Sequence, residues 1–568
     1  MNYIKPAFLL ILILAISTAI YAQIDHRSIS KMHNEAPDEK SVPMPLEEVK
    51  TSPGYVFEAS GIFTIQANVD EDGDNILGDA ANEPSIAVDP TDPNRIMIGW
   101  RQFDNVSSNF RQAGYAYSTD AGQSWTFPGS IDAGVFRSDP VLDCNNDGIF
   151  FYNSLTINGS GDYLCTVYKT GAGNVEWDEG TFAQGGDKQW MRIDNTGGTG
   201  SGNIYSNWTM SYSYCWPEYF TRSTDDGNVY ETCTTIPGEP FWGTENIGPD
   251  GELYVVGRGD FAHIMLAKST NAQVPGSAIV WEHFTAVDLD GQLSIQPEVN
   301  PVGLMGQVWV DCDRSDGSGR GNVYICASVD RYGSVDPGDV MFARSTDGGL
   351  NFEDPIRINN DISVYNHQWF ATMSVAPNGR IDVIWLDTRA DPAGLFKSVL
   401  YYSFSVDQGV TWSENEQMSA IFDPHLGWPQ QQKMGDYFDM VSDDGGAHLA
   451  WANTLNGEQD VYYSYITPDD VGIDDIARES SFARVSNFPN PFTDKTSIRY
   501  TLGADGHVRL SVYDIYGNEV AQLLNEQKSA GTFTVDFVAP GLSAGVYFAV
   551  LTVGDSSDRI RIVKVARY

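Results

Sequence analysis

Ser118-Thr-Asp120-Ala-Gly122-Gln-Ser124-Trp125 is a short stretch whose pattern returns at three later places in the chain. The copies are Ser223-Thr-Asp225-Asp-Gly227, Ser345-Thr-Asp347-Gly-Gly349-Leu-Asn351-Phe352 and Ser405-Val-Asp407-Gln-Gly409-Val-Thr411-Trp412. Each copy predicts a hairpin turn, because Gly supplies a positive φ and Asp bonds nearby backbone amides. A turn that recurs at long intervals indicates a repeated structural unit.

The pattern S-x-D-x-G-x-[ST]-[WF] resembles the Asp box of sialidase-like β-propellers. The resemblance implies an all-β propeller in which each box joins the third and fourth strands of a blade. Together with weaker copies, the units fall near residues 118, 169, 223, 269, 345, 405 and 466. We therefore expect seven blades, with six, the sialidase number, as the alternative. The last unit stops near Ile466, and Gly61-Ile-Phe-Thr-Ile-Gln66 is a free β run that we expect to close the ring.

The end of the chain carries four motifs of another kind. They are Phe488-Pro-Asn-Pro-Phe492, the stretch from Val512 to Val520, the stretch from Gly541 to Phe548, and the basic ending Lys564–Tyr568. In this order they resemble the C-terminal sorting domain of type IX secretion substrates. The resemblance implies an immunoglobulin-like β-sandwich that contacts the type IX machinery and is removed after export. The alternative is a generic accessory sandwich.

The start of the chain predicts a signal peptide over residues 1–22. Lys5 precedes an apolar run, Ala7–Ile16, and Ala22 ends a plausible cleavage site. The alternative is a retained anchor, although no later apolar stretch approaches membrane length. We expect a lead-in over 23–54, the propeller over 55–467, an acidic linker over 468–484 and the sorting domain over 485–568. The mature protein is then secreted or held at the outer cell surface, without a membrane span.

The net charge of −42 is concentrated in the propeller. Residues 484–568 hold nine Lys/Arg and eight Asp/Glu, so the acidic excess lies before them. A domain with this much negative charge repels nucleic acids and anionic membranes. The sequence has no cluster of basic residues that would offset this repulsion.

Six cysteines in an exported chain suggest disulfides. Of the fifteen possible pairings, the repeat favours three local bridges, each inside one unit: Cys144–Cys165, Cys215–Cys233 and Cys312–Cys326. The sequence alone does not decide among the pairings.

The propeller face opposite the Asp boxes is where loops from several blades can form a binding site. Acids, arginines and aromatics recur there, and such groups suit carboxylates and sugar faces. The ligand-binding candidates are Glu83, Arg101, Trp190, Arg258, Arg331, Trp369, Arg389, Asp436 and Tyr437. The alternative for each residue is that it ties one blade to the next.

We expect this face to recognise an extracellular glycan or other polymer, with no cofactor required. One alternative is an exo-α-sialidase-type hydrolase, and another is a structural surface protein. The sialidase family implies an arginine triad and a Tyr nucleophile, which Arg101, Arg258, Arg331 and Arg389 with Tyr437 or Tyr332 could supply. The spacing selects none of them and the family's Arg-Ile-Pro motif is missing, so no catalytic residue is assigned.

Two acidic loops are candidates for a structural Ca²⁺. Asp143, Asn145 and Asp147 follow D-x-N-x-D-G, and Asp70, Asp72 and Asp74 alternate in a second loop. Oxygen ligands at alternate positions suit a hard cation. The alternative is a plain Asx-rich hairpin in each case.

Overall fold

A computed structural model gives the conformation of residues 50–59, 61–259, 263–293, 297–468, 483–488, 492–502, 505–514, 518–529, 531–553 and 556–565. The chain divides into two compact units, residues 1–467 and 468–568. The expected signal peptide, nearly all of the expected lead-in and most of the expected linker lie outside the described residues.

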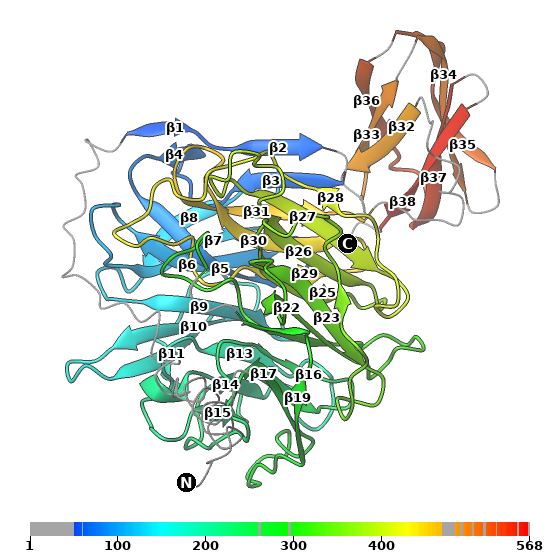
Figure 1. Ribbon diagram of the computed structural model, residues 1–568. Helices are drawn as coiled ribbons and strands as arrows, with labels where there is room; N and C mark the ends of the chain where they lie inside the picture. The colour runs from blue at the N-terminus through cyan, green and yellow to red at the C-terminus, as the bar shows by residue number, and fades with distance from the viewer. Residues whose placement is uncertain are drawn as a thin grey trace, which may run out of the picture. The chain divides into compact units, whose positions relative to one another are not determined.

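The first unit is built from antiparallel sheets that follow one another along the chain (Figure 1). The described residues form seven sheets of three to five strands and one small sheet, β1 (Thr51–Pro53) with β4 (Asp74–Ile76). The number of repeat units stays a prediction. In chain order the larger sheets are β5–β8 (Ala80–Val88, Ile96–Phe103, Gln112–Ser118, Thr126–Ile131), β9–β12 (Ser138–Cys144, Phe150–Ile157, Tyr163–Lys169, Thr181–Phe182), β13–β15 (Trp190–Ile193, Ile204–Asn207, Phe220–Ser223), β16–β19 (Glu245–Ile247, Leu253–Arg258, Ile264–Ser269, His283–Val287), β20–β24 (Gly291–Leu293, Trp309–Cys312, Val323–Arg331, Asp339–Ser345, Ile356–Arg357), β25–β28 (Gln368–Val375, Ile381–Asp387, Val399–Ser405, Glu416–Gln417), and β29–β31 (Asp439–Ser442, Ala447–Asn453, Asp460–Ile466) with β3 (Ile62–Gln66) and β2 (Val56–Ala59).

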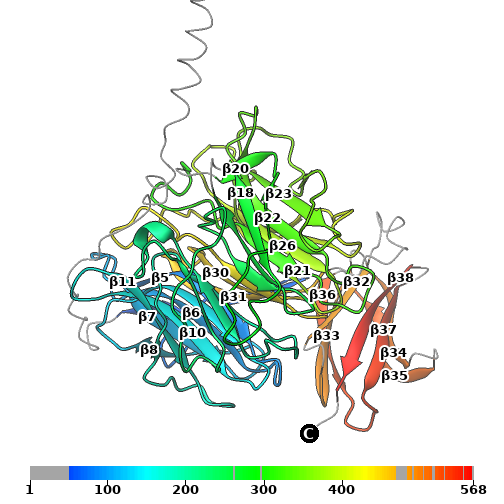
Figure 2. The same ribbon diagram turned by 90° about the horizontal axis from the view of Figure 1, so that it is seen from below.

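The innermost strands of these sheets form a closed cycle. Along it β5, β9, β13, β16, β21, β25 and β29 each contact the next, and β29 contacts β5 again. Figure 2 shows the sheets stacked face to face in this arrangement. A closed cycle of radially stacked antiparallel sheets is a β-propeller. Because both faces of a sheet are covered by neighbours, whole strands such as β26 and β27 are buried.

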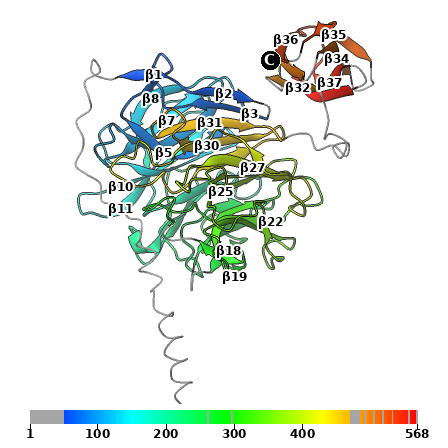
Figure 3. The ribbon, with the colours of Figure 1, turned by 45° about the horizontal axis from the view of Figure 1, so that its top comes forward.

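The ring is closed by a strand from its beginning, as the sequence predicts. β3 pairs antiparallel with β31, so that Ile62 lies opposite Ile466 and Gln66 opposite Tyr462. Figure 3 shows β2 and β3 lying beside β31 and β30. β2 adds a further strand outside β3, which the sequence analysis did not predict.

The four repeated segments form one turn with one set of bonds, which we call the S-x-D-x-G turn. In each turn the Gly amide donates to the Ser hydroxyl oxygen, at 2.8 Å in the first copy, and the Ser hydroxyl donates to the Asp carboxylate. The four glycines have φ between 76° and 85°. Each turn follows the third strand of its sheet, so all four lie on one face of the ring. The aromatic that ends a copy packs on the neighbouring sheet, as Trp125 does against Tyr463.

Only one of the three expected disulfides is present among the described residues. Cys215 and Cys233 are bonded, with their Cα atoms 6.4 Å apart. The prediction of Cys144–Cys165 is wrong: the two residues lie on β9 and β11, with β10 between them, and Cys144 is opposite Phe150 whereas Cys165 is opposite Leu155, five positions further along β10. The prediction of Cys312–Cys326 is also wrong. Cys312 lies opposite Val323 and Cys326 opposite Trp309, a separation of three positions along the ladder.

The second unit is a two-sheet β-sandwich. One sheet contains β32 (Ala483–Phe488), β33 (Lys495–Leu502) and β36 (Gly531–Val538), and the other contains β34 (Gly506–Asp514), β35 (Glu519–Lys528), β37 (Gly545–Val553) and β38 (Ser556–Lys564). Side chains alternate along β34, where Val508, Leu510 and Val512 point into the core. This period of two is the pattern of a half-buried strand.

Candidate functional site

Five charged side chains meet near the axis of the propeller, on the face opposite the S-x-D-x-G turns. We call Glu83, Arg101, Lys188, Lys433 and Asp436 the axial cluster. Glu83 Oε1 lies 3.2 Å from both Arg101 Nη2 and Lys433 Nζ, and Lys433 Nζ lies 2.9 Å from Asp436 Oδ2. Lys188 also pairs with Asp436. Lys188 precedes β13 and Asp436 precedes β29, which are not neighbouring strands of the cycle, so this pair spans the axis.

The axial cluster is sealed from solvent. Glu83 is 0% exposed, and Arg101, Lys433 and Asp436 are each 1% exposed. Burial raises the pKa of Glu83 to about 7, although Arg101 and Lys433 oppose that shift. Burial would lower the pKa of Lys188, but Asp436 and neighbouring acids hold it well above its usual value. The cluster therefore compensates its own charges rather than presenting them to a ligand.

The backbone that carries these side chains is in an uncommon conformation. Glu83, within β5, Asp139, at the second position of β9, and Lys188, two residues before β13, have φ of 50°, 49° and 55°. The register of β5 against β6 shifts between Asn82 and Ser85, which marks a bulge at Glu83. Non-glycine residues with positive φ cost free energy and are retained where the surroundings fix them. The bulges turn the charged side chains toward the axis.

Tyr437 and Trp190 lie beside the axial cluster, but both are packed. Tyr437 is 2% exposed, donates a hydrogen bond to the Pro140 carbonyl at 2.7 Å, and has its pKa raised well above its usual value by burial. Its ring centroid lies 5.3 Å from that of Trp190, which in turn lies 5.2 Å from that of Trp309. These edge-on contacts are typical of aromatic core packing.

The other four candidates do not join this cluster. Arg258 donates to the Leu293 carbonyl at 3.1 Å, Arg331 pairs with Asp290 at 2.5 Å, and Arg389 pairs with Asp387 at 2.7 Å. Trp369 is buried and donates to Ser398 at 3.1 Å. The arginines Arg101, Arg258, Arg331 and Arg389 therefore have separate partners. In the observed contacts no single residue bonds two of them. The nine candidates are thus divided between the axis and separate loops, and their role in ligand binding stays a prediction.

A cavity of about 340 Å³ opens on the same face, away from the axis. We call it the rim cavity. Its lining comes from the loop before β21, the loop between β22 and β23, and the residue before β25: Pro297, Glu298, Asp330, Arg331, Ser334, Val335, Asp336, Pro337 and His367.

Two side chains in the rim cavity have polar atoms without a hydrogen-bond partner. Asp336 is 6% exposed and its Oδ1 is unpartnered; His367 is 5% exposed and its Nδ1 is unpartnered. Burial and the nearby Asp339 raise the pKa of Asp336 to about 6, and burial lowers the pKa of His367 to about 4. Both atoms are buried and unpartnered, and because buried polar groups are usually bonded, they make this cavity a candidate site for water or a ligand.

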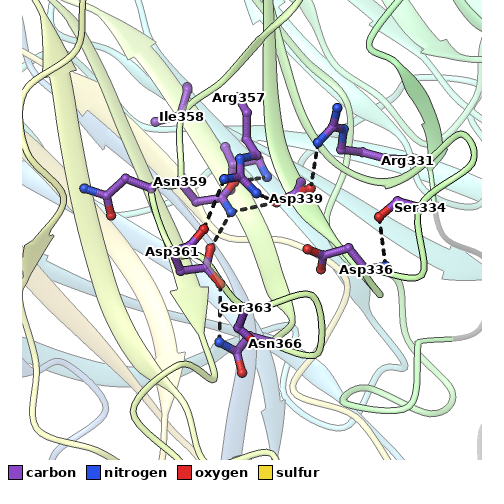
Figure 4. A network of polar contacts seen from close by, with 12 residues as sticks. Arg331, Ser334, Asp336, Asp339, Arg357, Ile358, Asn359, Asp361, Ser363 and Asn366 are labelled. Carbon is purple, nitrogen blue, oxygen red and sulfur yellow. Dashed lines mark hydrogen bonds and ion pairs between the residues drawn. The ribbon is translucent and has the colours of Figure 1, made fainter.

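A polar network supports the floor of the rim cavity (Figure 4). The Asn359 side-chain amide donates a hydrogen bond to the Asp339 carboxylate at 2.7 Å. Asp339 also forms ion pairs with Arg357 at 3.3 Å and with Arg331 at 3.6 Å. Asn359 also bonds Asp361 at 2.8 Å. These acids therefore have counter-ions, whereas Asp336 stands beside the network: its backbone amide donates to the Ser334 hydroxyl, its carboxyl is bonded by the Gly338 amide, and its Oδ1 has no partner. The network holds the loop that carries Asp336 in place.

Four residues that the axial cluster and the rim cavity depend on were absent from the candidate list: Lys188, Lys433, Asp336 and His367. Lys433 completes the axial cluster, but its loop has no counterpart in the repeat and gives no signal. Asp336 lies five residues after Arg331 in the same loop, so extending that loop to β23 would have found it. His367 lies two residues before the candidate Trp369.

A second cavity, of about 250 Å³, lies at the other end of the axis, on the face of the S-x-D-x-G turns. Its charged lining includes Asp143, Arg192, Asp311 and Arg314. Arg314 is 2.9 Å from Asp311 and donates a hydrogen bond to Asn246 at 3.0 Å. Its positive charge is therefore neutralised by residues that line the same cavity. The sequence analysis expected a pocket on the opposite face and did not predict this one.

The two proposed calcium loops form Asx turns. Asn145 accepts the amides of Asp147 and Ile149, and Asp143 accepts the amide of Ile193 on the next sheet at 2.8 Å. Asp70 accepts the amides of Asp72 and Asp74. In the described part of the chain, no three His, Cys, Asp or Glu side chains are grouped so as to hold a metal ion. Calcium binding stays a prediction.

Residues 486–565 match the sequence family described as a secretion system C-terminal sorting domain. The protein is therefore exported by type IX secretion to the cell surface or beyond. No helix in the described residues is long and apolar enough to cross a membrane. No curated protein sequence matches the chain.

Several solved structures are similar to the chain. A protein of unknown function from Dyadobacter fermentans has 14% identity, with 72% of this chain and 100% of that chain covered and a TM-score of 0.40. The endosialidase of phage phi92 has 10% identity, with 89% and 88% covered and a TM-score of 0.38. The Hadza microbial sialidase Hz136 has 12% identity, with 68% and 66% covered and a TM-score of 0.32. At such identities the similarity concerns the fold alone.

Proposed function

We propose that this exported propeller recognises an extracellular glycan, and that the glycan binds in the rim cavity. The observation that carries the proposal is the pair of buried, unpartnered atoms, Asp336 Oδ1 and His367 Nδ1, in a cavity of about 340 Å³. This volume falls within the range of roughly 300–1,000 Å³ that ligand sites have. Sugar hydroxyls donate and accept hydrogen bonds, so they can satisfy both atoms.

Exposed aromatic rings near the cavity support a sugar ligand. Tyr332 follows Arg331 and is 55% exposed, and Tyr365, two residues before His367, is 81% exposed. Large exposed apolar groups cost free energy in water, and flat aromatic faces are suited to the apolar faces of sugar rings. These two tyrosines come from the loops that also supply lining residues.

The test is binding of the full chain to a glycan array, with follow-up by calorimetry. We expect Tyr365→Ala and Asp336→Asn to weaken binding at least tenfold. Tyr214→Ala is the matched control, since Tyr214 is 45% exposed in a loop of another sheet. The proposal fails if no glycan binds, which would favour a structural surface role, or if Tyr214→Ala has the same effect as Tyr365→Ala.

Glycan cleavage in the same cavity is the second candidate function. Glu298, Asp330 and Asp336 bring three carboxyl groups to one wall, and the pKa of Asp336 is raised to about 6 by burial. A carboxyl with a raised pKa beside ionised ones is the usual requirement for glycoside hydrolysis. The sialidase alternative has less support, because the four candidate arginines have separate partners. Release of shorter glycans by the wild type but not by Asp336→Asn would favour cleavage over binding alone.

A further inference from the structure

We propose that the rim cavity selects a glycan that carries free ammonium groups, such as an oligosaccharide of non-acetylated amino sugars. This inference rests on the proposed function and narrows it to one class of glycan. It follows from the charges that face the cavity and from those that are already neutralised.

The cavity lining has an excess of acid. Glu298, Asp330 and Asp336 contribute carboxyl groups, and Arg331 is the lining cation. The Arg331 guanidinium is committed elsewhere, because its Nη2 and Nε bond Asp290 at 2.5 and 2.9 Å and its Nη1 lies 3.6 Å from Asp339. His367 is neutral near pH 7, since burial holds its pKa near 4. An anionic sugar such as a sialoside would therefore face repulsion.

Asp336 is the most buried acid of the lining, at 6% exposed. Asp339 and Asp361, behind the cavity, are paired with Arg357 and Arg389 respectively, at 3.3 and 3.9 Å. Asp336 has no such ion pair in the observed contacts, and its Oδ1 is unpartnered. A buried carboxylate without a counter-ion is costly, so a cation that reaches it recovers that cost.

An ammonium group matches the open atoms of the cavity. It donates three hydrogen bonds, and Asp336 Oδ1 and the unpartnered nitrogen of a neutral His367 are acceptors. Bonds between ions of opposite charge are about twice as strong as neutral ones. Pro297, Val335 and Pro337 give the cavity apolar walls for the ring of the sugar. The net charge of −42 also draws a polycation toward the protein over a longer range.

The experiment compares four probes on the full chain at pH 7: a tetramer of β-1,4-linked glucosamine, its N-acetylated form, cellotetraose and tetralysine. We expect the glucosamine tetramer to bind at least tenfold more tightly than either other sugar. Asp336→Asn should remove that advantage and leave binding of the other sugars unchanged. Asp250→Asn is the matched control, since it removes one charge from a residue on the face of the S-x-D-x-G turns.

Each outcome decides a different point. Equal or tighter binding of the N-acetylated or neutral sugar overturns the cation selectivity but keeps the proposed function. Equal loss in Asp336→Asn and Asp250→Asn, or no loss in either, shows that only the overall field attracts the polycation, and it overturns the inference. Binding of tetralysine without any sugar overturns both proposals. If Asp336→Asn is unfolded by circular dichroism, Glu298→Gln, a change at the exposed edge of the cavity, replaces it in the same comparison.

Discussion

The axial cluster and the rim cavity both gather charged side chains from separate loops, but they treat those charges differently. In the axial cluster the acids Glu83 and Asp436 are in contact with the cations Arg101, Lys188 and Lys433, and solvent is excluded. In the rim cavity Arg331 is drawn away by Asp290 and Asp339, which leaves Asp336 with an open oxygen. Convergence of charges thus indicates a candidate binding site where a cavity adjoins an acid that lacks an ion pair, as at Asp336, rather than where acids and cations pair with one another.

The largest difference between the two regions is expected for removal of one ionic partner. Lys433→Ala should destabilise the propeller by about 3–5 kcal/mol, because Glu83 and Asp436 would keep buried charges without that cation. Arg331→Ala should cost less than about 1 kcal/mol, because its pair with Asp290 is partly exposed and the buried Asp339 keeps Arg357 as a counter-ion. Urea unfolding of both variants measures the contrast. Equal losses would mean that the axial cluster is not a buried network.

A smaller contrast is expected for glycine. Gly435, next to Asp436, has φ of 102°, and an added Cβ would lie 2.6 Å from Glu83 Cγ. Gly435→Ala should therefore cost about 2–3 kcal/mol, through strain and a clash with the axial cluster. Gly333, in the rim loop, has φ of 70° and open space around it, so Gly333→Ala should cost only about 1 kcal/mol. Thermal unfolding of the pair checks this, and a larger loss for Gly333→Ala would contradict it.

Ligand binding in the rim cavity should depend on pH through Asp336. The axial cluster should not affect ligand binding. Asp336, with its pKa raised to about 6, is mostly protonated at pH 5, so affinity for a cationic ligand should fall about tenfold between pH 7 and pH 5. The charged groups around it are Asp339, Arg357, Asp361, Glu298, Asp330, Arg331 and the neutral His367. Calorimetry of the glucosamine tetramer at both pH values measures the change. The amino groups of the ligand also titrate in this range, so the quantity compared is the ratio of wild-type to Asp336→Asn affinity at each pH. This ratio should fall about tenfold from pH 7 to pH 5, and an unchanged ratio would assign the effect to another group.

The smallest expected effect is on stability. The pKa of Asp336 is higher in the folded protein than in the unfolded chain, so Asp336 destabilises the fold as pH rises from about 4 to about 6. Asp336→Asn should therefore raise stability at pH 7 by about 1 kcal/mol and change it little at pH 4. Guanidinium unfolding at the two pH values tests the sign. A loss of stability at pH 7 would show that Asp336 has a partner in the free protein.

The sequence predicts the propeller well where a feature repeats. The S-x-D-x-G turns and the closing strand Ile62–Gln66 follow from local pattern and from the need to pair an open edge. The cysteine pairs Cys144–Cys165 and Cys312–Cys326 were wrong, because membership of one blade does not decide which strand or which position a residue occupies. Lys433 and Asp336 lie in loops without any period, and whether a charge is compensated depends on distances that the sequence does not contain.

The pairing of β3 with β31 gives the chain an order of assembly. These strands lie about four hundred residues apart; β3 pairs on one side with β2, and its other edge has no partner until β31 is available. Contacts between residues so far apart in sequence form slowly, because the entropy of closing a long loop is lost before any stabilising contact is made. The sheet that joins the two ends of the propeller therefore forms only after residues up to Ile466 are available.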